Sequence, residues 1–277
     1  MAHVPSNALS TPKKTFEIHG IKPIKSLGQN FLVNEHPVEK LLAVAEIRPN
    51  DTIIEIGPGL GILTARLAEQ AKKVIAIEKD AAMVALLQNT FADSKKVHII
   101  HGDALTMDYA PYAPQDSNYK VVANLPYHIT APTIRKFLEA PNQPESITLI
   151  IQKEVAQRIC AKPPNMSILA VSVQWYAAAK IISSVKKSSF WPQPRVDSAI
   201  IHIIPHKKTL AVTPVQFFTI VKAGFLHPRK QLINNLSVGL CIEKEAVASL
   251  LKHHAIAPNQ RAETLTIQDW INLAKAL

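Results

Sequence analysis

The stretch TIIEIGPGLGILTARLAEQAKKVIAIEKD, residues 52–80, decides the fold of this chain. It reads as a short apolar strand at 52–56, a turn with three glycines, a helix at 62–70 and a second strand at 73–77 that ends at Glu78. Glycines permit a tight turn and a close approach of the backbone to a ligand. An acidic residue about 20 positions after such a turn accepts hydrogen bonds from ribose hydroxyls in nucleotide-binding α/β proteins. The alternative is a simple turn beside a solvated glutamate.

Short apolar runs and helical patterns continue to alternate along the chain. The runs are apolar on both faces and therefore read as buried parallel strands. This alternation predicts an α/β fold with a doubly wound, mostly parallel, seven-stranded sheet. A proline-rich loop at 188–196 alone separates the last two strands, which favours an antiparallel strand at one edge. The expected strands are 52–56, 73–77, 97–100, 120–123, 147–151, 180–185 and 199–204.

The pattern changes after residue 205, where only helical stretches follow. Thr213 before Pro214 predicts a capped helix start, and Thr266 with Asp269 predicts a capping box. We therefore expect a flexible basic arm at 1–24, a ligand-binding α/β domain at 25–205 and a small all-α domain at 210–277.

Charge is unevenly distributed over the 277 residues, which carry 31 Lys and Arg against 21 Asp and Glu, a net +10. Residues 206–277 hold nine Lys and Arg against four Asp and Glu, half of that net charge. Such an excess predicts a polyanionic partner. Lys222, Arg229 and Lys230 are the candidate nucleic-acid contacts, although a solvated basic face is the alternative for any one of them.

Cysteine content and hydropathy indicate the cellular compartment in which the protein works. Cys160 and Cys241 form no CxxC pair, which argues against a disulfide framework or a zinc cluster and fits a reducing cytoplasm. The histidines are scattered, so no metal is expected. The N-terminal stretch lacks the apolar core of a signal peptide, and no uncharged run approaches the ~18 residues of a membrane span. We expect a cytoplasmic monomer without membrane contact.

The glycine spacing bears on the ligand. A pyrophosphate-binding turn has the pattern GxGxxG, whereas here Gly61 comes one residue early and Ile62 takes the usual position. Glu55 before the turn would repel a pyrophosphate. The pattern ExGxGxG therefore fits a ligand with a cationic amino-acid moiety, such as S-adenosylmethionine (SAM), better than a nicotinamide dinucleotide. It disfavours an NAD-dependent dehydrogenase.

Two later strand ends carry further chemistry. Asp103 could accept a hydrogen bond from the amine of a bound adenine, unless it only caps a helix. Asn124-Leu125-Pro126-Tyr127 matters because an aromatic exocyclic amine is a poor nucleophile. The Asn124 side-chain oxygen and a backbone carbonyl held by Pro126 can accept both N–H hydrogens and favour a pyramidal nitrogen. Tyr127 could then stack on the base, unless residues 124–127 are a bare turn.

Eight motifs share their order and spacing with one known family. They are KSLGQNFL (25–32), EIGPGLGILT (55–64), IEKD (77–80), GDAL (102–105), NLPYHIT (124–130), LIIQKEVAQR (149–158), FWPQPRVDSAI (190–200) and FLHPRKQLINNL (225–236). From about residue 20 onward the chain resembles the ribosomal RNA adenine N6,N6-dimethyltransferases, most closely those that act on the small subunit.

This resemblance implies a Rossmann-like SAM-dependent methyltransferase fold, with SAM as the cofactor and ribosomal RNA as the substrate. The family dimethylates two adjacent adenosines in a hairpin loop near the 3′ end of 16S rRNA, so the implied partner is the small ribosomal subunit, with a role in its biogenesis. Asn124, Leu125 and Tyr127 would hold the target adenine. Phe190 would be the second face of an aromatic sandwich, or alternatively a loop anchor. SAM would be bound by Asn30, Leu32, Gly57, Gly59, Glu78, Asp103 and Asn124.

Two other functions stay open at this point. One is a large-subunit rRNA adenine dimethylase of the macrolide-resistance type, and the other is a non-catalytic assembly factor that binds RNA. The chain also departs from the family at residues 162–169, KPPNMSIL, where a Gly-Arg pair is usual. An RNA contact at that place is therefore in doubt.

Overall fold

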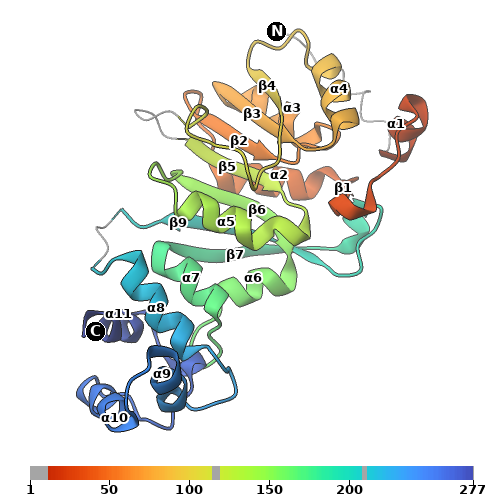
Figure 1. The fold of residues 1–277 in the computed structure, drawn as a ribbon. Helices are drawn as coiled ribbons and strands as arrows, with labels where there is room; N and C mark the ends of the chain where they lie inside the picture. The colour runs from red at the N-terminus through yellow and green to blue at the C-terminus, as the bar shows by residue number, and fades with distance from the viewer. Residues whose placement is uncertain (1–11, 114–118, 208–210, 277) are drawn as a thin grey trace. The chain divides into compact units, whose positions relative to one another are not determined.

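The computed structural model describes residues 12–113, 119–207 and 211–276. Within these residues a seven-stranded sheet has the order β4-β3-β2-β5-β6-β9-β7 (Figure 1). Parallel pairing joins β4 to β3, β3 to β2, β2 to β5 and β5 to β6. The α/β fold predicted from the sequence is confirmed. The strands are β2 (Thr52–Ile56), β3 (Lys73–Glu78), β4 (Val97–His101), β5 (Tyr119–Asn124), β6 (Ser146–Gln152), β7 (Ala177–Val185) and β9 (Ser198–Pro205).

The antiparallel strand is β9, and its place differs from the prediction. It pairs with β6 and lies between β6 and β7, not at the edge. The burial of the two strands explains this order. β9 is largely apolar and is buried over Ser198–Ile201 and at Ile203, as an inner strand should be. β7 alternates between exposed and partly buried residues, which suits the edge position that it takes.

Helices pack against the sheet on the segments where the sequence predicts them. α2 contacts β5, β6 and β9, whereas α3 packs on β3 and α4 on β3 and β4. Asn34 caps α2 by accepting a hydrogen bond from the backbone N–H of His36, and Asp80 caps α4 through Ala82. These helices are α2 (Glu35–Ala45), α3 (Ile62–Gln70), α4 (Ala81–Thr90), α5 (Thr130–Leu138) and α6 (Lys153–Ile159).

The prediction of a flexible arm over residues 1–24 is wrong where the structure describes it. Pro12–His19 form the helix α1, and the side chain of Phe16 is only 3% exposed. Its ring lies 4.9 Å from that of Phe31 and 5.4 Å from that of Trp191. The polar residues of this stretch suggest a loose arm, but one buried aromatic residue, Phe16, anchors a short helix. Residues 1–11 lie outside the described part.

Phe31 and Trp191 belong to a second, smaller sheet. In it β1 (Phe31–Leu32) pairs antiparallel with β8 (Phe190–Trp191). This pairing joins the segment before α2 to the loop between β7 and β9. Two segments that are distant in the sequence are therefore held together, and Leu32 and Phe190 pack against core residues of the main sheet. Short 3-10 turns lie at Lys25–Leu27, Tyr127–Ile129, Lys187–Ser189 and Ala262–Thr264.

Two compact units divide the chain, and the boundary differs from the predicted one. The first, here the sheet unit, comprises the described residues up to Ala156 together with Lys180–Pro205. The second, the helical unit, comprises Gln157–Ala179 and the residues from His206 onward. The sequence predicts residues 157–179 in the α/β domain. They contain α7 (Ile168–Tyr176), which packs against C-terminal helices instead.

Aromatic residues hold the helical unit together. Trp175 of α7 stacks on Phe217 of α8, with ring centroids 4.4 Å apart and an interplanar angle of 8°. The predicted cap at Thr213 and the predicted capping box of Thr266 with Asp269 both form, and Gln216 completes a second capping box with Thr213. The helices are α7 (Ile168–Tyr176), α8 (Pro214–Gly224), α9 (Leu232–Leu240), α10 (Lys244–His253) and α11 (Ile267–Lys275).

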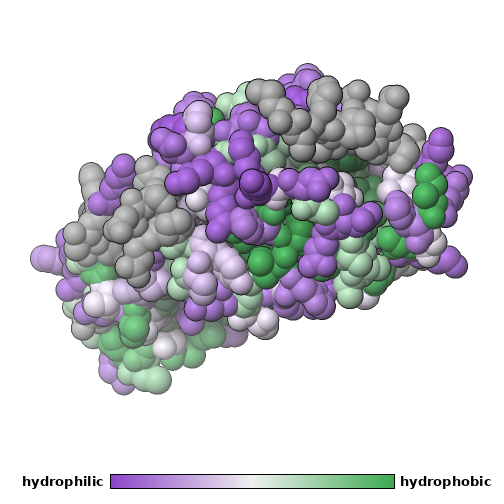
Figure 2. All heavy atoms as spheres, turned by 90° about the horizontal axis from the view of Figure 1, so that it is seen from above, coloured by the Kyte–Doolittle hydropathy of each residue, from purple (hydrophilic) through white to green (hydrophobic). Residues whose placement is uncertain are grey.

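Figure 2 shows one face of the molecule, on which hydrophilic residues predominate and hydrophobic residues gather near the middle. Among the described residues, none of the helices has both the length and the apolar character that a membrane crossing requires.

Candidate active site

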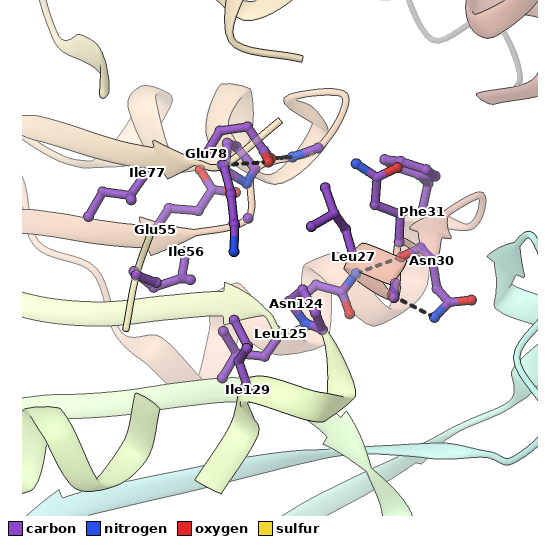
Figure 3. Close-up of a pocket in the computed structure, with 18 of the residues that line it drawn as sticks. Leu27, Asn30, Phe31, Glu55, Ile56, Ile77, Glu78, Asn124, Leu125 and Ile129 are labelled. Carbon is purple, nitrogen blue, oxygen red and sulfur yellow. Dashed lines mark hydrogen bonds between the residues drawn. The ribbon is translucent and has the colours of Figure 1, made fainter. Parts of the chain in front are cut away.

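A pocket opens in the sheet unit where the parallel strands end. Its walls come from the residues that follow the carboxyl ends of β2, β3, β4 and β5, together with the segment before α2 (Figure 3). In doubly wound sheets the strand order reverses beside the first strand, and ligands bind in that crevice. The pocket-lining segments are 27–32, 55–60, 62–63, 77–79, 102–105 and 124–129.

The glycine turn has the backbone shape that requires glycine. Gly57, Gly59 and Gly61 all have positive φ angles, of 68°, 56° and 80°. A Cβ on Gly61 would lie 2.8 Å from the ring of Phe91, and one on Gly59 would lie 3.0 Å from the ring of Phe31. The turn is therefore packed closely from behind, and its backbone forms the pocket wall.

Glu78 ends β3 and is held by backbone donors. One carboxylate oxygen accepts from the N–H groups of Lys79 and Asp80 at 2.8 and 2.9 Å, and the other accepts from Gly59 at 3.3 Å. Its side chain is 7% exposed, so it is not a solvated strand end. Burial raises the pKa of Glu78, against the effect of these hydrogen bonds. The carboxylate thus has a fixed orientation at the pocket wall.

Glu55 is a second buried acid in the same wall. Thr64 donates its hydroxyl to this carboxylate over 2.7 Å. Burial, and to a smaller extent the nearby charge of Glu78, raises the pKa of Glu55 to about 8. The sequence associates Glu55 with a cationic ligand group and argues against a pyrophosphate. The structure adds that this carboxyl is buried in the pocket wall and bonded to Thr64.

Asp103 and Lys79 both line the pocket and form an ion pair. Lys79 Nζ is 2.8 Å from one oxygen of Asp103, and the backbone N–H of Leu105 donates to the other at 2.8 Å. The hydrogen bond from Lys79 holds the pKa of Asp103 below its usual value. Lys79 was missed by the sequence analysis because its partner is 24 residues away. Parallel pairing of β3 with β4 brings the two together.

Asn124 stands at the end of β5 with its amide fixed. Its Nδ2 donates to the backbone carbonyl of Asn30 at 3.0 Å, and Asn30 in turn donates its own amide to the carbonyl of Gly28 (Figure 3). Leu125 follows, almost fully buried, with its N–H bonded to the carbonyl of Ile150. The predicted residues Asn30, Asn124 and Leu125 therefore meet at one point of the pocket.

Tyr127 begins the short turn after Pro126 and also lines the pocket. Its hydroxyl lies 2.9 Å from the hydroxyl of Ser198, the first residue of β9. Burial raises the pKa of Tyr127, so the phenol keeps its proton at neutral pH. Ser198 was not singled out from the sequence, since nothing local distinguishes it within FWPQPRVDSAI.

Most predicted site residues line this pocket, but four do not. Phe190 is 3% exposed in the core behind β1 and is not among the lining residues. Its role as a stacking face stays a prediction. Lys222, Arg229 and Lys230 are exposed on the helical unit. Arg229 and Lys230 precede α9, which begins at Leu232.

Comparison with known proteins identifies the family. The family described as ribosomal RNA adenine dimethylase matches residues 21–277. The chain belongs to this family. A relative from Dehalococcoides mccartyi, named ribosomal RNA small subunit methyltransferase A, is 42% identical over 275 residues, which cover 99% of this chain and 94% of that protein. A relative of the same name from Geobacillus kaustophilus is 38% identical and covers 97% of both chains. The resemblance inferred from the motifs is confirmed.

Solved structures agree with the fold. A dimethyladenosine transferase from Plasmodium falciparum superposes with a TM-score of 0.74 at 26% identity, over 88% of this chain and 95% of its own. The 23S rRNA methyltransferase ErmE gives a TM-score of 0.72 at 24% identity, over 90% of this chain and 99% of its own. The second likeness concerns the fold alone.

Proposed function

We propose that this protein transfers methyl groups from SAM to N6 of two adjacent adenosines near the 3′ end of small-subunit rRNA. The observation that carries this proposal is the fixed amide of Asn124, which stands in the same pocket as Glu78 and Asp103. A nucleoside cofactor needs acceptors for its ribose hydroxyls and its adenine amine, and a target amine needs acceptors for its N–H hydrogens. The names of the full-length relatives support the choice of the small subunit.

The residues of the pocket fit SAM. The Glu78 carboxylate, already oriented by three backbone N–H groups, can accept hydrogen bonds from the ribose hydroxyls. Asp103 can accept from the adenine amine, and the apolar side chains of Ile56 and Ile77 offer surface for its ring. Glu55 suits the cationic amino-acid end. When bound, SAM supplies an electrophilic methyl group on a positively charged sulfur.

The residues at the end of β5 act on the target adenine. Asn124 Oδ1 and the carbonyl of Leu125, held by Pro126, accept the two N–H hydrogens of the amine. They stabilise the positive charge that develops on nitrogen in the transition state, because oriented dipoles need no reorganisation. A strong base is unnecessary since the nitrogen becomes acidic once it is alkylated. Tyr127 supplies a stacking surface for the base, which must leave its own stack first.

The remaining parts of the proposal concern the RNA. We assign the SAM site to residues 25–205 and a contact with RNA to residues 210–277, through Lys222, Arg229 and Lys230. A monomer that works in the cytoplasm suits a ribosomal substrate. Binding to an immature subunit would also give the protein a role in small-subunit biogenesis.

Labelled SAM tests the proposal directly. The protein is incubated with labelled SAM and with small or large ribosomal subunits from an unmodified strain, and rRNA fragments are analysed by mass spectrometry. We expect dimethyladenosine at two adjacent positions in small-subunit rRNA. Label in large subunits alone would establish the macrolide-resistance type of activity instead. Tight binding to small subunits without any methylation would establish a non-catalytic assembly factor.

A further inference from the structure

The position of β9 brings a buried serine to the edge of the sheet where the pocket lies. β5 and β6 are parallel, so their carboxyl ends lie at this edge. β9 runs antiparallel to β6, and its first residue, Ser198, is paired with Gln152, the last residue of β6. An antiparallel strand inserted at this place therefore begins where its neighbours end. Ser198 reaches the level of Tyr127 across one intervening strand.

Ser198 is fully buried, and its hydroxyl is 2.9 Å from the hydroxyl of Tyr127. The residue before it is held by two hydrogen bonds. The carbonyl of Asp197 accepts from the N–H of Lys153 at 3.0 Å, and the Asp197 carboxylate accepts from the N–H of Lys187 at 2.9 Å. Ser198 does not line the pocket itself. It is thus a rigid anchor that touches Tyr127 from behind.

We propose that Ser198 is a positioning residue for the methyl transfer, because its hydroxyl fixes the ring of Tyr127 on which the target adenine stacks. This inference rests on the function proposed above. The phenol oxygen lies at the end of the ring farthest from the backbone. A hydrogen bond there, together with the Cα at the other end, restrains both side-chain torsions of Tyr127. The base is then held at the height at which Asn124 can accept its N–H hydrogens.

The hydrogen bond also assigns the Tyr127 hydroxyl a role other than proton transfer. This hydroxyl is hydrogen-bonded to Ser198, and burial raises the pKa of Tyr127. Tyr127 therefore presents a flat aromatic surface to the pocket in a fixed orientation. Base–aromatic stacking contributes through that surface and requires the ring to be in place.

A double-mutant cycle tests the proposal with Ser198→Ala, Tyr127→Phe and the double variant. Loss of one neutral hydrogen bond predicts that kcat for small-subunit methylation falls about three- to tenfold in each single variant. The double variant is expected to fall no further, since both changes remove the same bond. Affinity for SAM, measured by calorimetry, should stay within about twofold of wild type, because Ser198 lies behind the pocket wall. Ser146→Ala makes the same change at another buried strand start and should leave kcat unchanged.

A spectroscopic readout separates positioning from general stability. With tyrosines labelled with ¹³C at Cζ, the Tyr127 resonance should shift in Ser198→Ala, and its titration should move to higher pH, since the hydrogen bond between Ser198 and Tyr127 lowers the pKa of the phenol. The same resonance should not respond in Ser146→Ala. Tyr127→Phe keeps the test decisive if Ser198→Ala folds poorly.

Three results would overturn the inference. They are wild-type kcat in Ser198→Ala, additive losses in the double variant, or an unshifted Tyr127 resonance. In each of these the wild-type enzyme methylates small subunits and the proposed function stands. Failure of the wild-type protein to methylate any small-subunit adenosine would instead remove the proposed function, and this inference with it.

Discussion

The side chain of Asn124 donates to the backbone carbonyl of Asn30 over 3.0 Å, although 94 positions separate the two residues. The nitrogen and oxygen of an amide lie on opposite sides of its carbon, so this bond turns Oδ1 away from Asn30. Among the described residues no hydrogen bond of the protein engages that oxygen. Asn124 is therefore set as an acceptor before any substrate arrives, which is what electrostatic preorganisation requires.

We expect Asn124→Ala to lower methyl transfer to small subunits about 100-fold or more, because one preorganised dipole is lost where charge develops. Affinity for small subunits should remain near wild type. Transfer of labelled methyl groups and filter binding measure the two quantities. Asn89→Ala, at an exposed site on α4, is the matched control. A parallel loss of subunit affinity would show that the variant is misfolded.

Glu78→Gln should weaken SAM binding. The carboxylate accepts three backbone N–H bonds, two on one oxygen and one on the other. A glutamine must direct its NH₂ group at one of these donors, and it also loses the charge. Hydrogen bonds to charged groups of this kind predict an increase of about 10- to 100-fold in the Kd for SAM. Calorimetry would contradict the assignment if the Kd were unchanged, and small-subunit affinity should be unaffected.

The buried carboxyl of Glu55 should make the free energy of unfolding depend on pH. Burial raises its pKa to about 8, from an ordinary value of 4.5 that applies in the unfolded chain. Between these values the folded protein keeps a proton that the unfolded chain releases, so the free energy of unfolding falls as pH rises. The contribution is fully present below the unfolded value and is lost by about pH 8.

Glu55→Gln keeps a neutral group that can still accept from Thr64, so it should remove this dependence. The Tm of the variant should therefore fall less than the wild-type Tm between about pH 5 and pH 8, the range below the raised pKa. Glu78 is present in both proteins and its contribution cancels in the comparison. Glu69→Gln, exposed on α3, should follow the wild-type curve. Identical slopes for wild type and Glu55→Gln would refute the buried state of Glu55.

What the sequence predicted well is local. The glycine turn, the strands on either side of it, the helix cap at Thr213 and the capping box at Thr266 are set by neighbouring residues, so the sequence pattern predicts them. The site residues at strand ends followed from one rule, that carboxyl ends of parallel strands share an edge. This rule placed Glu78, Asp103 and Asn124 together without any knowledge of the tertiary structure.

What it missed depends on contacts between distant segments. The pairing of Lys79 with Asp103 and of Tyr127 with Ser198 needs the strand order, and the sequence placed the antiparallel strand at the edge. The burial of Phe190 opposite Leu32 was not indicated by the sequence, and its role as a stacking face stays a prediction. The helix around Phe16 and the transfer of residues 157–179 to the helical unit have the same cause.

A substitution at Lys120 is expected to lower the stability of the fold without changing the affinity for SAM. At the amino end of β5, away from the pocket, its buried ammonium is 2.9 Å from Asp51 and also donates to the carbonyls of Ala45 and Glu46. Lys120→Met leaves Asp51 as an unpaired buried charge, so the free energy of unfolding should fall by about 3 kcal/mol or more. Urea unfolding measures this. Adding Asp51→Asn should restore part of the loss, and SAM affinity below the Tm should match wild type.

Lys222, Arg229 and Lys230 test whether the helical unit binds RNA. All three are exposed, so their neutralisation should not disturb the core. Each phosphate contact releases counterions and adds about 0.7–0.9 to the salt slope of log K. The triple change to Gln should therefore lower that slope by roughly 2–3 and weaken small-subunit binding, while the Kd for SAM stays unchanged. The same change at Lys244, Lys252 and Lys275, which are exposed on the same unit, is the control for net charge. Equal losses in both triple variants would show that the overall charge matters and that these three positions do not, whereas a loss confined to the first would assign the contact to them.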